Sequence, residues 1–258
     1  MKKEKLLVLA KTYPVISRKY EHLVCVAGLT EDNNWRRIYP IPWELFWKGS
    51  EKKFKKKTWI EYELVDDRPS DRRPESRKID FESIKVLDEE DFREIKRRLD
   101  EKLANLDELE DKDDREVSLS VIKPILKDFV WTDSEYFEKV EEMSKQITLG
   151  EGKSAVKIDV PDKKFQFVFR CCRDCKKTHT IMCEDWEMGI LYIKMREKDP
   201  KSAPIKVRSK FYNEIPKKGH LYFILGTHNI HGSWLIISVV YPKQNDLDIL
   251  RQQILPIS

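Results

Sequence analysis

The stretch HLVCVAGLTEDNNWRRIYPIPW, residues 22–43, decides the fold class of the N-terminal third of this chain. It contains two short segments rich in β-branched and aromatic residues, which the turn-forming residues EDNN at 31–34 separate. This pattern predicts two antiparallel strands joined by a tight turn. Similar strand-like segments recur at residues 5–13, 58–67 and 77–87. Five short strands with proline-containing turns predict a small antiparallel β-barrel-like domain over residues 1–87.

The middle of the chain has the periodicity of helices. Over residues 88–109 the apolar residues recur every three or four positions, which gives a helix one apolar face. Thr132 and Glu135 have the spacing of a capping box, which predicts the start of a second helix over residues 133–147. We therefore expect a helical connecting segment over residues 88–150.

The C-terminal part of the chain combines strand and helix patterns. KKFQFVFRC at 163–171 is typical of a strand, and EDWEMGILYIKMREKD at 184–199 is typical of a helix. Two apolar strands at 220–227 and 233–242 flank the sequence HNIHG, which predicts a hairpin. These patterns predict an α+β domain over residues 151–258, and they place the whole chain in the α+β class.

The composition is that of a folded and highly charged protein. Hydrophobic residues make up 40% of the 258 residues, enough to bury a core and to exclude a disordered chain. Charged residues make up 37%, a bias that is typical of proteins from hot environments. The N-terminal apolar run LLVLA is too short for a signal peptide, and no run approaches the length of a membrane span. We expect a cytoplasmic protein with reduced cysteines.

Four of the five cysteines and one histidine fall within residues 171–183. Cys172 and Cys175 lie at the end of a predicted strand, and His179 and Cys183 would share one face of a helical turn. Together they offer three sulfur atoms and one nitrogen atom, a tetrahedral donor set that suits zinc. We therefore expect a closed zinc site at these four residues, with Cys171 as an alternative first ligand.

The spacing of these four residues resembles that of a zinc knuckle, whose ligands follow Cys-x2-Cys-x4-His-x4-Cys. Here each of the last two gaps is one residue shorter, and the glycine that precedes the knuckle histidine is absent. The resemblance implies metal binding more than the contact with single-stranded nucleic acid that knuckles often make. The run C…C…H…DWE also resembles one in uncharacterised prokaryotic proteins, a likeness that implies no activity.

Two alternatives to a closed zinc site stay open. The cysteines could be packed, inert thiols or a redox pair. A catalytic zinc ion could instead use Cys172, Cys175 and His179, with water as the fourth ligand.

Basic and aromatic residues in the N-terminal part predict contact with nucleic acid, which the net charge of +4 permits. Strand alternation places Trp35, Arg37 and Tyr39 on one face, where rings could stack on bases and the guanidinium group could bind phosphate. Two loops rich in lysine and arginine follow, although neighbouring acidic residues could pair with them instead. The candidate nucleic-acid-binding residues are Trp35, Arg36, Arg37, Tyr39, Lys55, Lys56, Lys57, Arg68, Arg72, Arg73 and Arg77.

Four residues are candidates for catalysis. His228 and His231 in the predicted hairpin could bind a metal or do acid–base chemistry near neutral pH, and a solvated turn is the competing account. Asp185 and Glu187 lie at the start of a predicted helix, where carboxylates complement the helix dipole. The alternative is that one of these carboxylates orients His179.

These features predict a nucleic-acid-binding protein with a structural zinc site, and single-stranded DNA or RNA is the favoured partner. Two other classes stay open. One is a metal-dependent nuclease or nucleic-acid-modifying enzyme that uses the four catalytic candidates. The other is an adaptor whose charged patches contact a partner protein. The sequence has no phosphate-cradling glycine loop and no nucleophile elbow, so it names no reaction.

Overall fold

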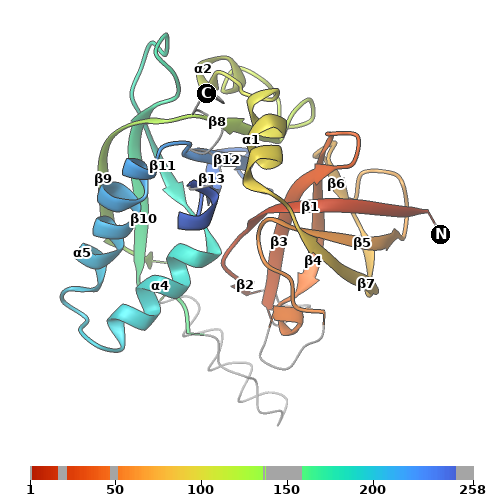
Figure 1. Ribbon diagram of the computed structural model, residues 1–258, viewed down its shortest axis with the longest axis horizontal. Helices are drawn as coiled ribbons and strands as arrows, with labels where there is room; N and C mark the ends of the chain where they lie inside the picture. Colours follow the sequence, from red (N-terminus) through yellow and green to blue (C-terminus); the bar gives the residue numbers. More distant parts are fainter. Residues whose placement is uncertain (1, 17–21, 47–51, 136, 138–158, 248–258) are drawn as a thin grey trace, which may run out of the picture.

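Two β-sheets that lie side by side form the body of the molecule (Figure 1). The computed structural model describes residues 2–16, 22–46, 52–135, 137 and 159–247. The first sheet has the strand order β6-β4-β3-β1-β5-β7, and β2 pairs with β3 beside this path. Its strands are β1 (Lys3–Lys11), β2 (Val15–Ile16), β3 (His22–Thr30), β4 (Trp35–Pro42), β5 (Thr58–Leu64), β6 (Ser76–Arg77) and β7 (Ile79–Glu89).

The second sheet has the order β8-β12-β13-β11-β10-β9, and short helices lie beside it (Figure 1). Its strands are β8 (Leu119–Ile122), β9 (Ile125–Asp133), β10 (Lys163–Arg170), β11 (His179–Cys183), β12 (Tyr222–Thr227) and β13 (Trp234–Val240). The helices are η1 (Trp43–Phe46), α1 (Phe92–Asp100), α2 (Leu106–Leu109), α4 (Trp186–Arg196), α5 (Ala203–Arg208), the π-helical η2 (Ser209–Glu214) and η3 (Pro216–Lys218).

The central strands of both sheets are buried on both faces. Along β1, Leu6 and Val8 enter one core and Leu7 and Leu9 enter another, because successive side chains on a strand point to opposite faces. The residues of β12 alternate between two cores in the same way. A strand buried on two faces requires a continuous apolar run, which is the pattern that the sequence has in both strands.

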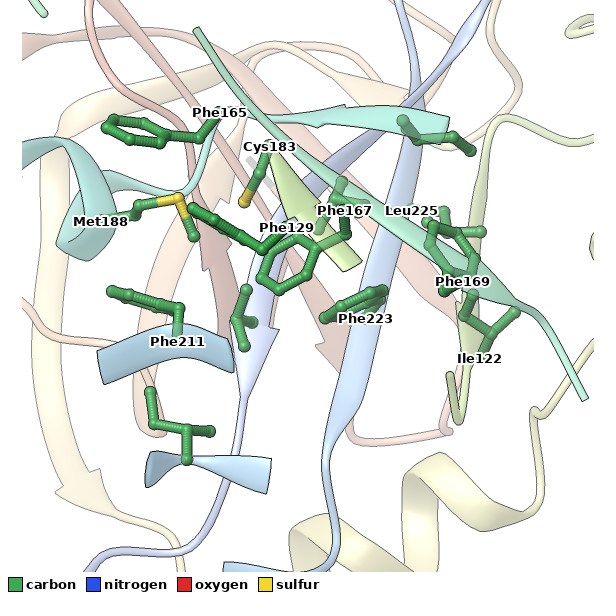
Figure 2. Close-up of a cluster of buried hydrophobic side chains, with 14 of the residues drawn as sticks. Ile122, Phe129, Phe165, Phe167, Phe169, Cys183, Met188, Phe211, Phe223 and Leu225 are labelled. Atoms are coloured by element: carbon green, nitrogen blue, oxygen red, sulfur yellow. The ribbon is translucent and has the colours of Figure 1, made fainter. Parts of the chain in front are cut away.

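Three hydrophobic cores result from this arrangement. The first sheet curls around an inner core, which includes Leu6 and Val8. An inter-sheet core lies between the two sheets and takes in the apolar face of α1. An outer core lies between the second sheet and the helices α4 and α5; Figure 2 shows part of it, where Phe167 and Phe223 pack with ring centroids 4.6 Å apart.

Much of the expected secondary structure is present. The chain is a mixed α+β protein with mostly strands, and its N-terminal sheet is curled and half-barrel-like (Figure 1). The predicted strands of the N-terminal part correspond to β1, β3, β4, β5 and β7, and the predicted C-terminal strands and helix correspond to β10, β12, β13 and α4. Within the described part of the chain, no helix is long and apolar enough to cross a membrane.

The expected helical middle is wrong over residues 119–133, which form β8 and β9. These strands join the second sheet, because β8 pairs with β12 and β9 pairs with β10. Thr132 lies opposite Lys164 in the β9–β10 ladder, so it is no helix cap. The single helix expected over 88–109 is divided into α1 and α2. Most of the helix expected over 133–147 lies outside the described residues.

A buried ion pair joins the two sheets. Lys56, just before β5, places its Nζ 2.7 Å from Oδ2 of Asp185, the residue that caps α4. Oδ2 also accepts from Ser238 Oγ at 3.1 Å and from Val239 N at 2.8 Å on β13. Oδ1 accepts from two backbone N–H groups in the first turn of α4. Burial alone would lower the pKa of Lys56, but Asp185 and Glu187 outweigh it and raise the pKa.

We predict that Lys56→Met destabilises the protein by about 3–5 kcal/mol, because it leaves the carboxylate of Asp185 buried without its cation. Urea unfolding of the purified variant measures this loss. The control is Lys243→Met, which removes an exposed ion pair with Glu89 and should cost at most about 1 kcal/mol. Equal unfolding midpoints for the two variants would contradict the prediction.

Candidate metal centre

Four side chains at one end of the second sheet could hold a metal ion. Asp107, Cys171, Cys175 and His179 each offer one donor atom, and these atoms lie within 4.8 Å of one another. Asp107 belongs to the first turn of α2, the two cysteines lie in the turn after β10, and His179 begins β11. The side chains of Cys171, Cys175 and His179 are buried. The cluster therefore joins a helix of the middle segment to two strands of the second sheet.

The distances between the donors fit a single ion. Nε2 of His179 lies 3.0 Å from Oδ1 of Asp107 and 3.3 Å from Sγ of Cys175, and this Sγ lies 3.6 Å from Oδ1 of Asp107. Zinc–ligand distances of about 2.0–2.3 Å separate neighbouring ligand atoms of a tetrahedron by about 3.3–3.8 Å. The two distances from Cys175 lie in this range and the His179–Asp107 distance is shorter, so an ion would need only a small shift of these donors.

Contacts around the cluster orient the donors. Nδ1 of His179 lies 3.1 Å from Oε1 of Glu110, the carboxylate contact that fixes a ligating imidazole so that its other nitrogen faces the metal. Oδ2 of Asp107 accepts from the backbone N of Lys176 at 2.8 Å, which leaves Oδ1 for the ion. The Arg170 side chain donates to the carbonyl of Cys175 at 3.1 Å and stabilises the turn.

The donor set differs from the expected one. Cys175 and His179 are brought together, but Cys171 takes the place of Cys172, and Asp107 takes the place of Cys183. The Sγ of Cys172 lies 3.9 Å from that of Cys171, at the edge of the cluster. Asp107 carried no sequence signal, because the chain has 46 acidic residues and none stands out by its spacing.

The expected helical turn from His179 to Cys183 is wrong, because these residues are the two ends of strand β11. Positions four apart on a strand share a face but lie about 13 Å apart, too far for one ion. Figure 2 shows the Cys183 side chain in the outer core, near Phe129, Phe165 and Met188. Burial raises the pKa of the Cys183 thiol well above its usual value, as expected for a packed cysteine.

Most of the expected nucleic-acid-binding residues make contacts within the chain. Trp35 packs against the inter-sheet core and Lys56 binds Asp185, whereas Lys55, Arg68 and Arg72 are exposed. Even Arg68 pairs with a neighbouring acid. The remaining ion pairs are Arg36 with Glu4, Lys57 with Asp246, Arg68 with Asp66, Arg72 with Asp114, Arg73 with Asp71 and Arg77 with Asp67.

Three of these residues and one of the catalytic candidates line a cavity between the two sheets. Arg37, Tyr39 and Arg73 from the first sheet and His228 from the hairpin after β12 line this inter-sheet cavity, whose volume is about 200 Å3. Arg37 is only 1% exposed, which corrects the expectation that its side chain lies on an open nucleic-acid-binding face. Sequence alternation placed it beside Tyr39 but could not show that the second sheet covers both.

The four catalytic candidates are not brought together. The rings of His228 and His231 stack with centroids 4.9 Å apart in the hairpin. Asp185 and Glu187 bind Lys56 at the start of α4, and no hydrogen bond or ion pair among the described residues links them to the histidines. The alternative in which Asp185 or Glu187 orients His179 is wrong, because Glu110 has that position.

Comparison with known families assigns both halves of the chain. The family described as a domain of unknown function, DUF8757, matches residues 100–255, which include all four candidate metal donors. The chain belongs to this family. A second domain of unknown function, DUF8758, matches residues 2–104, which carry the first sheet and α1. No curated protein matches the chain.

We predict that Cys171→Ser, Cys175→Ser and Asp107→Ala each reduce bound metal to well below one ion per chain, because each removes a donor from the cluster. Elemental analysis of protein prepared without chelator measures the metal content. Cys172→Ser and Cys183→Ala are the matched controls and should keep the metal. Loss of metal in Cys183→Ala with retention in Asp107→Ala would instead favour the donor set first expected from the sequence.

Proposed function

We propose that the four-donor cluster binds a structural zinc ion. Two thiolates, an imidazole and a carboxylate form a donor set that zinc accepts in tetrahedral geometry, whereas magnesium and calcium prefer oxygen donors alone. Four protein donors leave no open position for water, which favours a structural over a catalytic role. The likeness of residues 172–183 to a zinc knuckle supports the same metal, although only Cys175 and His179 serve in both sets.

The ion would add a link between α2 and the second sheet, beside the contacts of Glu110 with Lys177 and His179. α2 has only four residues and is too short to be stable on its own. Metal binding at Asp107 would fix it against the turn that joins β10 to β11. Burial raises the pKa of the Cys171 thiol to about 12, so a metal must displace its proton on binding.

We also propose that the protein binds nucleic acid, and that it does so at the inter-sheet cavity. One observation supports this site: Arg37 is buried, lines the cavity and makes no ion pair among the described residues. Its guanidinium group donates to Ser118 Oγ at 2.7 Å and to the Ser118 carbonyl at 2.9 Å, both uncharged acceptors. A buried charge without a counter-charge is costly, and an anionic ligand would supply that counter-charge.

The aromatic and basic neighbours of Arg37 suit nucleotides better than other anions. Tyr39 is half-buried at the cavity, where its ring could stack on a base. Arg73 adds a second guanidinium group. The lysine- and arginine-rich loops contribute less to this proposal, because most of their cations already pair with acids.

We predict that the purified protein contains about one zinc ion per chain and that a strong chelator lowers its Tm by about 10 °C, because a structural zinc site contributes directly to folding. Elemental analysis and calorimetry with and without chelator measure both effects. Readdition of zinc should restore the Tm, and readdition of magnesium should not. Protein that is metal-free as purified, with a Tm unchanged by zinc, would contradict the prediction.

We predict that single-stranded oligonucleotides bind at low salt and that their affinity falls steeply as salt rises, because phosphate contacts release counterions. Fluorescence anisotropy titrations at several salt concentrations measure this. Arg37→Met should weaken binding about tenfold or more. Arg68→Met, which removes an exposed arginine outside the cavity, should change affinity less than about twofold. Absence of binding to any oligonucleotide at low salt would refute the proposed nucleic-acid function.

A further inference from the structure

The inter-sheet cavity contains unused hydrogen-bonding capacity. Within the part of the chain that the structure describes, Nε of Arg37 and Oγ1 of Thr227 are buried without any hydrogen-bond partner. Both residues line the cavity, and they come from different sheets, β4 and β12. Buried polar groups in folded proteins almost always have partners, so these two groups are available to bind a ligand or water in the cavity.

The charges around the cavity favour an anion. Arg37 has no counter-charge in an ion pair, while Arg73 is balanced by Asp71 at 2.6 Å and donates to the Thr227 carbonyl at 3.1 Å. The acid that lines the cavity is Glu184, and burial raises its pKa to about 7, so a large fraction of it is uncharged at neutral pH. The side chains that line the cavity therefore carry more positive than negative charge.

The remaining titratable groups at the cavity are neutral. Burial, then the charges of His231 and Arg73, lower the pKa of His228, so its imidazole is uncharged at pH 7. Burial also raises the pKa of the Cys25 thiol, although Arg37 and Arg73 act against this shift. Burial lowers the pKa of Arg37, and the nearby carboxylates of Glu75 and Asp71 act against this shift, but neither acid lines the cavity. A protonated Glu184 would be a further donor.

These groups fit a phosphate monoester better than a carboxylate. A phosphate monoester has three terminal oxygens and nearly two negative charges, so it can accept from the guanidinium, hydroxyl and protonated carboxyl groups and balances the charge of Arg37 more strongly than a singly charged carboxylate does. The cavity has a volume of only about 200 Å3, which suits a single phosphate group with part of the molecule attached to it. Ile230, which is 74% exposed in the hairpin, and Tyr39 also line the cavity, where they could contact the attached sugar and base.

We infer that the inter-sheet cavity binds the phosphate monoester of a nucleotide, with Arg37, Thr227 and Glu184 as its binding residues. The ligand is either a free mononucleotide or the phosphorylated end of a nucleic-acid strand. For the strand end, the inference rests on the proposed nucleic-acid function and makes it specific for termini. For the free mononucleotide, the inference does not depend on the proposed nucleic-acid function.

The test compares ligands and variants by calorimetric titration and fluorescence anisotropy. The ligands are inorganic phosphate, a nucleoside 5′-monophosphate, the matching nucleoside, and one oligonucleotide with and without a 5′-phosphate. We expect the 5′-phosphate to strengthen binding of the monophosphate over the nucleoside by about tenfold or more, and inorganic phosphate to compete. If the ligand is a strand end, the phosphorylated oligonucleotide shows the same preference.

Two variants separate binding from folding. Arg37→Met should weaken phosphate binding about tenfold or more, and Thr227→Val should weaken it several-fold without lowering the Tm, because the hydroxyl that it removes has no partner in the free protein. Glu184→Gln should strengthen binding at pH 8, where it removes a negative charge from the cavity. Thr227→Val with wild-type affinity for every phosphate ligand would overturn the inference.

The failures of the two proposals are distinguishable. Oligonucleotide binding that is indifferent to the terminal phosphate, together with no binding of inorganic phosphate or the monophosphate, overturns the phosphate site and leaves the nucleic-acid function in place. Binding of the monophosphate without binding of any oligonucleotide supports the phosphate site and removes the nucleic-acid function. Binding of none of these ligands overturns both.

Discussion

The carboxylate of Asp185 is the contact on which the arrangement of the two sheets depends. It binds Lys56 from the first sheet, caps the first turn of α4 and accepts two hydrogen bonds from β13. A carboxylate this deeply buried is tolerated only when all its ion-pair and hydrogen-bond partners are in place. Lys56, α4 and β13 must therefore take up one relative arrangement around it. The hydrophobic cores supply most of the stabilising free energy, whereas this ion pair fixes how the sheets face each other.

Strand β11 and the residues just after it connect that contact to both candidate sites. His179 begins the strand on the face of the metal cluster, and Cys183 ends it in the outer core. The next residue, Glu184, lines the inter-sheet cavity, and Asp185 follows as the cap of α4. Because alternate residues point to opposite faces, one short strand places a metal donor on one side of the second sheet and a cavity residue near the other.

The strands that could be predicted from the sequence are those whose local composition by itself indicates a strand. The segments around β1, β3 and β12 are short apolar runs bounded by polar or turn residues. β8 and β9 were missed because their identity depends on pairing with β12 and β10, which lie far away in the chain. The helical spacing of His179 and Cys183 misled for the same reason, since pairing with β10 makes that segment a strand.

The sites were predicted less well than the fold, because both are assembled from distant segments. Residue type and local spacing identified Cys175 and His179, but the partner Asp107 comes from α2 and is one acid among many. Arg37 stood out as a cation on a strand, yet its burial follows from Ser118 and the hairpin after β12, which cover it from the second sheet. A buried cation that has no ion-pair partner among the described residues has a different role from a cation on the surface. On the surface it would attract any polyanion, whereas at the inter-sheet cavity, as we propose, it would bind a small anion that supplies an ion-pair partner.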